Sequence, residues 1–307
     1  MAVSMESTRE RYTTTTRGLR RDIPPMLLYE RAKKLGVWNP SDIDFTQDKA
    51  DFAAMTDGQR DMLLRLTSFF VSGEEAVTID LLPLINVVAQ EGRLEEEMYL
   101  TTFLWEEGKH VDFFSRFLDE VCGSPTHLHE YRSSSYRTII GEALPSAMNA
   151  LRTDHSPAAV ARASSVYNMV VEGMLAETGY YAYFTIMDKY NILPGQRQGI
   201  AKLKQDESRH IAYGVYLLSR LMSENPEVWE VVESTMNELL MPGLGVIDEI
   251  FSVYEPDPMP FDVSKEDFMN YAAGQFQKRM SRVERSRGLT LEQINKESKA
   301  IIENDDA

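Results

Sequence analysis

The chain has 307 residues, a formal net charge of −16 and a hydrophobic content of 43%. The acidic balance argues against a nucleic-acid-binding protein, because phosphate recognition requires a surplus of Lys and Arg on at least one face. The single cysteine, Cys122, excludes an intramolecular disulfide and a cysteine-ligated metal centre, and it indicates a reducing, cytoplasmic setting.

The hydrophobic periodicity is helical almost throughout, which predicts an all-α fold. We expect a disordered leader over residues 1–22, a single helical domain over 23–290, and a C-terminal helix with an acidic tail over 291–307. The longest apolar stretch, 76–89, is interrupted by polar residues and Pro83 and is too short to span a bilayer, so no integral membrane segment is expected.

Two pairs of long helices are predicted, over about 57–90 with 94–121 and over about 157–190 with 196–223. Their short connections predict antiparallel hairpins, and hence a four-helix bundle elaborated with additional helices. The additional helices are expected over 25–35, over 131–151 with an interruption at Pro145, from Pro226 toward Pro242, and from Ser264 to about Ser286.

Two of the five histidines stand in the same local pattern, Glu107–His110 and Glu207–His210, with two residues between the Glu and the His. Residues three apart share a helix face, so each pair can point at one object. One such pair alone is weak evidence, because it forms a surface ion pair more often than a metal site.

Each pair follows another glutamate at a similar distance. Glu74 lies 33 residues before Glu107 (107 − 74), and Glu172 lies 35 residues before Glu207 (207 − 172). Each half of the chain therefore reads as a helix with one Glu and a returning helix with Glu-x-x-His. This is the ligand pattern of di-iron and di-manganese carboxylate bundles, and it predicts six metal ligands: Glu74, Glu107, His110, Glu172, Glu207 and His210.

The helix faces through Glu74, Glu107 and Glu207 are otherwise apolar, where an unpaired carboxylate is costly. The alternative, buried ion pairs, requires basic residues on the same faces, and none stands near Glu74 or Glu107. The face of Glu172 is less decisive, with Glu177 as a competitor. Carboxylate and imidazole donors suit Fe and Mn, and such a site leaves coordination positions open for O₂.

Asp206 precedes the ligand Glu207, and we expect its carboxylate to accept the other ring N–H of a ligand histidine, His110. A solvent-exposed aspartate is the alternative.

These residues resemble the ribonucleotide reductase small subunit superfamily, which is ferritin-like in fold, over about Trp38 to Tyr216. The segment 38–44 resembles that superfamily's tryptophan segment, and Asp206 resembles the aspartate that links a ligand histidine to this tryptophan. The closer resemblance is to the ligand-binding oxidases related to the reductase subunit. It is carried by residues 73–78, 91–94, 167–173 and 178–181, the last of which include Tyr180.

The resemblance implies a Mn/Fe centre at the six ligands, with di-iron as the alternative, and O₂ as co-substrate. Trp38, Asp206 and Tyr180 would surround the ligands. It also implies a long-chain fatty-acid-like ligand in a tunnel, a homodimer, an electron donor of unidentified nature, and an ether link between Val77 and Tyr167. Tyr167 lies about 140° from Glu172 on an ideal helix, so the link needs a local distortion; by composition, both linked residues are core residues.

The function predicted from the resemblance is a two-electron C–H oxidation by an O₂-activating metal oxidase or oxygenase. A Mn/Fe reductase small subunit, an acyl desaturase and ferritin-like metal storage are the alternatives. Phe114 stands where the reductase subunit stores a tyrosyl radical. The reductase subunit also has a tyrosine in the C-terminal tail that docks on its large partner, whereas the last tyrosine here is Tyr271. Both points weaken the reductase interpretation. The segment 180–187 is a candidate tunnel lining, with core packing as the alternative.

Overall fold

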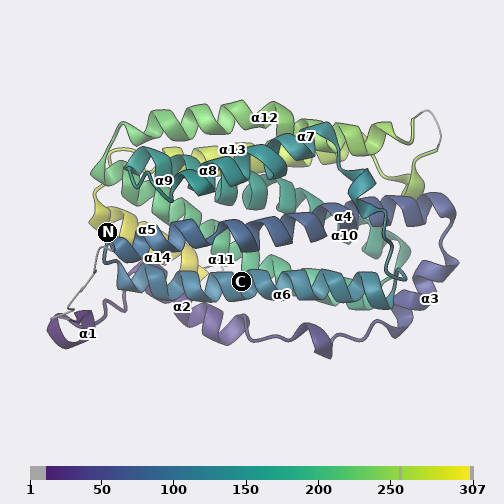
Figure 1. Cartoon of the computed structure of the whole chain (residues 1–307), viewed down its shortest axis with the longest axis horizontal. Coiled ribbons are helices and arrows are strands. Elements are labelled where there is room, and N and C mark those ends of the chain that lie inside the picture. The colour runs from purple at the N-terminus through teal and green to yellow at the C-terminus, as the bar shows by residue number, and fades with distance from the viewer. Residues whose placement is uncertain (1–11, 256–257, 305–307) are drawn as a thin grey trace, which may run out of the picture.

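The computed structural model describes residues 12–255 and 258–304, and every regular element in these ranges is helical. The fold is the predicted all-α, ferritin-like bundle. The core consists of four long helical runs that lie side by side (Figure 1). They are α4 (Asp57–Asp80), α6 (Leu94–Glu120), the continuous run α9 (Pro157–Ser164), η4 (Ser165–Ala176) and α10 (Glu177–Tyr190), and α11 (Pro194–Glu224).

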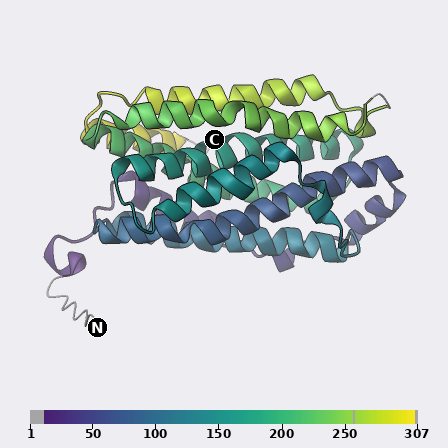
Figure 2. The ribbon, with the colours of Figure 1, turned by 45° about the horizontal axis from the view of Figure 1, so that its top comes forward.

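The remaining long helices cover this core. The N-terminal α2 (Pro24–Leu35) packs on α6 and α11, and α14 (Leu291–Asn304) packs on α11 and α2. On the opposite side, α12 (Val228–Ser252) and α13 (Lys265–Glu284) lie together and contact η4, as Figure 2 shows in green and yellow. The shorter elements are α1 (Thr13–Thr16), η1 (Pro40–Asp42), α3 (Thr46–Ala54), α5 (Leu82–Gln90), η2 (Leu128–Tyr131), α7 (Ser134–Tyr136), η3 (Arg137–Ala143), α8 (Leu144–Ala150) and η5 (Pro260–Asp262).

The two ends of the chain are described in part. Of the expected leader, residues 1–11 lie outside the described residues; beyond them α1 forms a short helical turn, and the Arg17 guanidinium donates to both oxygens of Glu95 at 2.7 and 2.9 Å. The expected C-terminal helix is present as α14, and residues 305–307 of the acidic tail lie outside the described residues. No helix in the described part is long and apolar enough to cross a membrane.

The predicted single helix over 57–90 is wrong in one respect, because α4 ends at Asp80 and α5 begins at Leu82. Pro83 has no N–H to donate to the preceding turn, and its ring opposes a straight continuation. The predicted start near residue 57 is confirmed, because α4 begins at Asp57 and Thr56 caps it: the Thr56 side chain accepts from the Gln59 N–H while the Gln59 side chain accepts from the Thr56 N–H.

The predicted end of a helix at Pro242 is also wrong, because α12 runs through this proline to Ser252. The apolar periodicity continues beyond the proline with the buried side chains of Val246, Ile247 and Phe251. Their packing outweighs the hydrogen bond that Pro242 cannot make. In the segment 131–151 the expected interruption takes the form of η3, a π-helical stretch that ends two residues before Pro145.

A second π-helical stretch, η4, shapes the core. Its wider turn, with hydrogen bonds between residues five apart, brings positions i and i+5 toward the same side of the helix. Tyr167 and Glu172 are such a pair, so this is the local distortion that the sequence requires. Gly214 of α11 lets the two helices approach closely: a Cβ there would lie 2.2 Å from the Cβ of Asn168.

The turn between α10 and α11 is held by α3. Leu193 adopts a left-handed conformation with φ of 55°, and its N–H donates to Asp51 at 2.8 Å. The buried carboxylate of Asp48 accepts from the N–H groups of Gly195 and Gln196 at the start of α11. A carboxylate at this position satisfies donors that the helix itself leaves free, so the register of α11 relative to the core is fixed.

Candidate metal centre

The six predicted ligands come from all four core runs. Glu74 lies on α4, Glu107 and His110 on α6, Glu172 on η4, and Glu207 and His210 on α11. Each is at most 5% exposed. The structure therefore brings together, in the interior, six side chains that span more than a hundred residues of sequence.

The donor atoms form two overlapping sets, and within each set they all lie within 4.8 Å of one another. One set holds Glu74 and His110, the other holds Glu172 and His210, and both include Glu107 and Glu207. Nδ1 of His110 lies 3.4 Å from oxygens of both shared glutamates, and Nδ1 of His210 lies 3.3 and 3.4 Å from them. This is the arrangement of two adjacent cation sites with two carboxylates in common.

The charges of the cluster fit a bound cation rather than an internal ion pair. In the described ranges, the four glutamates contact no Lys or Arg within ion-pair distance; their only basic neighbours are the two histidines. Five buried atoms that face the centre make no hydrogen bond with a described residue: Glu107 Oε2, Glu172 Oε1, Glu207 Oε2, and Nδ1 of His110 and His210. Buried groups of this kind are tolerated when a metal takes the free donor atoms. The competitor Glu177 lies outside both sets, 3.9 Å from Lys204.

The protonation of the metal-free cluster follows from the same crowding. Burial raises the pKa of Glu74 to about 8 and that of Glu172 well above its usual range. For Glu107, burial again raises the pKa, but the neighbouring imidazoles of His110 and His210 outweigh it and lower the pKa to about 2. Burial lowers the pKa of both imidazoles, yet the surrounding carboxylates raise it well above the usual value. Metal ions would replace these protons.

Asp206 connects the centre to Trp38. Its Oδ2 lies 3.3 Å from Nε2 of His110 and accepts from the Trp38 indole N–H at 2.7 Å and from Lys109 at 3.0 Å. The Trp38 ring stacks on the His110 ring, with 6.3 Å between the ring centres. The structure thus places Trp38, Asp206 and His110 in one hydrogen-bonded chain.

Glu106 has the corresponding place on the other histidine, and the sequence reasoning missed it. Its Oε2 lies 2.9 Å from Nε2 of His210, and its Oε1 accepts from Arg209 at 2.6 Å. The signal was present, because an acidic residue directly precedes both Glu107 and Glu207. Such carboxylates orient the imidazole and raise its basicity as a ligand.

Val77 and Tyr167 meet beside the centre. The Tyr167 phenol oxygen lies 3.2 Å from Glu107 Oε1 and 3.3 Å from the backbone carbonyl of Val77. Both side chains are buried. Tyr180 is buried as well, stacked on Phe70, and its hydroxyl has no partner in the described part of the chain. Phe114 occupies the interior next to Phe70, so no hydroxyl stands at that position.

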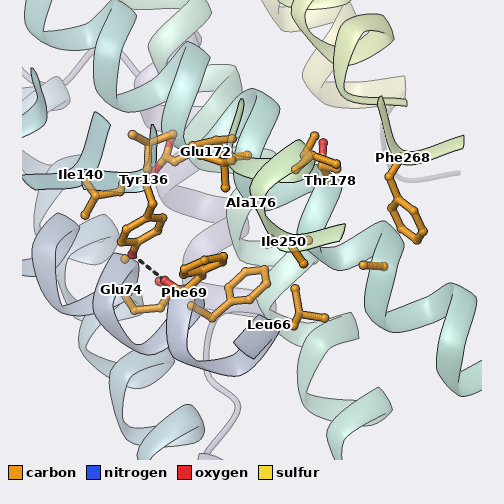
Figure 3. A pocket seen from close by; sticks show the side chains of 18 of the residues that line it. Leu66, Phe69, Glu74, Tyr136, Ile140, Glu172, Ala176, Thr178, Ile250 and Phe268 are labelled. Carbon is orange, nitrogen blue, oxygen red and sulfur yellow. Dashed lines mark hydrogen bonds between the residues drawn. The ribbon is translucent and has the colours of Figure 1, made fainter. Parts of the chain in front are cut away.

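An apolar cavity, partly open to solvent, leads to the centre. Glu74 and Glu172 lie toward one end in Figure 3 and Phe268 toward the other. Glu207 and Val77 also line it, together with aliphatic and aromatic side chains of α4, η4, α10, α12 and α13. Of the candidate segment 180–187, Ala182 and Ile186 line the cavity. No Lys or Arg is among its described lining residues.

A ferritin-like bundle with two overlapping carboxylate–histidine sets defines the class of dinuclear metal-carboxylate proteins. Comparison with known proteins agrees: residues 27–282 match the ribonucleotide reductase small chain family. An R2-like ligand-binding oxidase with aerobically reconstituted Mn/Fe cofactor is 38% identical, with a TM-score of 0.86 over 90% of this chain and 98% of the other. A variant with anaerobically reconstituted Mn/Fe cofactor is 39% identical, with a TM-score of 0.84 over the same shares.

The chain therefore belongs to the ribonucleotide reductase small chain family, among its R2-like ligand-binding oxidases. It is a metal-dependent oxidoreductase whose interior offers a dinuclear metal site.

Proposed function

We propose that the chain binds one Mn and one Fe ion and uses them with O₂ to oxidise a C–H bond of a long-chain fatty-acid-like ligand. The observation that carries this proposal is the junction of the two donor sets with the apolar cavity, at Glu74, Glu172 and Glu207. Di-iron loading is the alternative, since both metals accept carboxylate and imidazole donors.

Each ligand has a distinct part in holding the metals. Glu107 and Glu207 would help to hold both ions, because both donor sets contain them. His110 with Glu74, and His210 with Glu172, would complete one site each. The bound ions supply O₂ reduction and the resulting oxidising power. The protein residues fix the donor positions and keep bulk water away.

The cavity supports an apolar ligand with one polar end. Its walls are almost entirely hydrocarbon; Thr178 and Tyr136 donate their hydroxyl hydrogens to the backbone oxygens of Met174 and Phe69. The carboxylates at the inner end would repel an anionic head group unless metal cations neutralise them. A fatty-acid-like molecule with its head toward the loaded centre satisfies both conditions.

The same oxidising power would join Val77 to Tyr167. The phenol loses its O–H hydrogen, a Val77 side-chain carbon loses one hydrogen, and an O–C bond forms. The two electrons and two protons pass to O₂, so the chain becomes lighter by two hydrogen atoms. The Tyr167 phenol oxygen lies 3.3 Å from the backbone carbonyl oxygen of Val77 and 3.2 Å from Glu107 Oε1, and this proximity supports the proposal.

Aerobic loading with Mn(II) and Fe(II), followed by intact-mass measurement and peptide mapping, tests the proposal. We expect the loss of two hydrogens and one peptide that contains both Val77 and Tyr167. The Tyr167→Phe variant should keep its metals and show no loss. Separate peptides from fully loaded wild-type protein would contradict the cross-link, and two metals per chain would still support the dinuclear site.

Three further features are proposed. The resemblance implies a homodimer and reducing electrons from a separate donor, and the single cysteine indicates the cytoplasm. Light scattering of the purified protein tests the first point. Restored ribonucleotide reduction in a mixture with a large subunit would instead support the alternative, a Mn/Fe reductase small subunit.

A further inference from the structure

Lys109 holds a buried positive charge between two indole rings. It stands beside the ligand His110 on α6 and is only 7% exposed. Its Nζ lies 4.4 Å from the ring centre of Trp38 and 4.5 Å from that of Trp105. Hydrogen bonds to the Gly36 carbonyl oxygen at 2.6 Å and to Asp206 at 3.0 Å keep it there.

The two indoles connect the centre with the surface. Trp38 donates to the Asp206 oxygen that lies against His110, and Trp105 is 49% exposed. Indole is among the side chains that lose an electron most readily. An oxidised centre could therefore take an electron from Trp38, which could in turn take one from Trp105. The centre would then be reduced by tryptophan and not by a group on the cavity side.

The Lys109 charge opposes that loss. A neutral indole attracts an ammonium group over its face, whereas an indole that has lost an electron is itself a cation and is repelled. The repulsion is strong, because the charge is desolvated and close to the ring. Asp206 and Glu106 pair with Lys109 and Arg209, and of these four charged groups Lys109 is the one that lies over the indole rings. No Lys or Arg lines the described walls of the cavity, so Val77 and the ligand meet no such opposition.

We propose that Lys109 is an electrostatic barrier that suppresses one-electron oxidation of Trp38 and Trp105 and so confines oxidation to the cavity side of the centre. The suppressed step is the transfer of one electron from the Trp38 ring to the oxidised centre, which would leave an indole radical cation. The inference rests on the proposed function, because it takes O₂ activation at the centre as its source of oxidant. Lys109 acts on the indoles by position and charge and touches no reacting atom.

The first test needs only the wild-type chain. After loading with Mn(II) and Fe(II) in air, peptide mass spectrometry measures oxygen addition at Trp38, Trp105 and Trp229, which are all the tryptophans of the chain. Trp229 on α12 is the internal reference. We expect Trp38 to be oxidised no more than Trp229. Preferential oxidation of Trp38 would overturn the proposal without any variant.

The second test removes the charge. Lys109→Gln keeps a hydrogen-bond donor without the charge, and Lys109→Arg, the matched control, keeps the charge. We expect Lys109→Gln to raise the Trp38 to Trp229 oxidation ratio at least about tenfold over wild type, and Lys109→Arg to stay within about twofold. An unchanged ratio in a folded, metal-loaded Lys109→Gln protein would overturn the proposal.

A third measurement separates this inference from the proposed function. Metal-free protein is exposed to photogenerated tris(bipyridine)ruthenium(III), an external one-electron oxidant. We again expect the Trp38 to Trp229 oxidation ratio to be higher in Lys109→Gln than in wild type and Lys109→Arg. Equal ratios in the three proteins would overturn the proposed role of Lys109. If wild-type protein loaded with metals consumes no O₂, the proposed function fails, and this arm still decides the role of Lys109.

Discussion

The Glu106 carboxylate lies 2.9 Å from Nε2 of His210, on the side of the ring that faces away from the centre. Asp206 lies 3.3 Å from Nε2 of His110 in the same relation. Each imidazole therefore points Nδ1 at the shared glutamates and Nε2 at a carboxylate from the facing helix. The two halves of the bundle therefore share the carboxylate at Nε2 of the histidine, in addition to the pattern of metal ligands.

The carboxylate behind each histidine should set metal affinity. Glu106→Gln and Asp206→Asn should each weaken metal binding by about 10- to 100-fold, because a neutral amide orients the imidazole less firmly and does not increase its basicity. Competition with a chelator of known affinity measures the effect. Two variants that bind both metals as tightly as wild type would show that these contacts serve packing alone.

Glu107 should matter more than any unshared ligand, because both donor sets contain it. We expect Glu107→Ala to reduce the metal content from two ions to at most one per chain, as measured by elemental analysis after gel filtration. Glu177→Ala is the matched control, a mostly buried glutamate outside both sets, and it should retain two. Equal loss in both variants would point to misfolding rather than to a lost ligand.

The metal-free protein should lose stability as the pH rises. The folded-state pKa of Glu74 is raised from 4.5 to about 8 and those of Glu172, His110 and His210 are raised as well, so the folded chain binds more protons than the unfolded chain in this window. Stability contributed by such groups is present at low pH and is lost as the pH passes the folded pKa. Between pH 6 and pH 9 we expect the Tm of the metal-free protein to fall by about 4 °C or more.

Metal binding should reverse this trend, because the ligands bind metals in their deprotonated forms and affinity rises with pH. The gap in Tm between loaded and metal-free protein should therefore widen from pH 6 to pH 9 in scanning calorimetry. Glu74→Gln lacks one of the titrating groups and should show a smaller fall when metal-free. A metal-free Tm that rises over this range would contradict the assigned protonation.

Filling the cavity should exclude the ligand and spare the metals. Ala176 lines the cavity on η4, and Ala176→Phe would place a ring in the ligand's path. We expect extracted protein to carry at least about tenfold less bound lipid by mass spectrometry, with two metals still present. Ala158→Phe, at an exposed position of α9, is the control. Undiminished lipid in Ala176→Phe would place the ligand elsewhere.

The sequence foretells the bundle and the meeting of the six ligands because helical periodicity and the Glu-x-x-His repeat are local signals. The break at Leu81 was foreseeable from Pro83, whereas the passage of α12 through Pro242 depends on tertiary packing that no local pattern carries. On an ideal helix Tyr167 and Glu172 point in different directions, which predicted a local distortion, and the π-helical stretch η4 is that distortion. Glu106 was overlooked although its position repeats that of Asp206.

The cavity and the Lys109 contacts lie beyond local sequence signals. Cavity walls come from eight separate helical elements, so no single stretch has a recognisable lining pattern. From the sequence alone, Lys109 resembles an ordinary lysine on a helix surface. Its contacts depend on the packing of α6 against the segment that contains Gly36 and Trp38.

Anomalous diffraction at the Mn and Fe absorption edges, on crystals of aerobically loaded protein, is the most direct test of the dinuclear site. Two peaks are predicted, one beside Glu74 and His110 and one beside Glu172 and His210, with Glu107 and Glu207 between them. Peaks at other residues, or no peak among these six side chains in metal-replete crystals, would contradict the metal centre on which the proposed function depends.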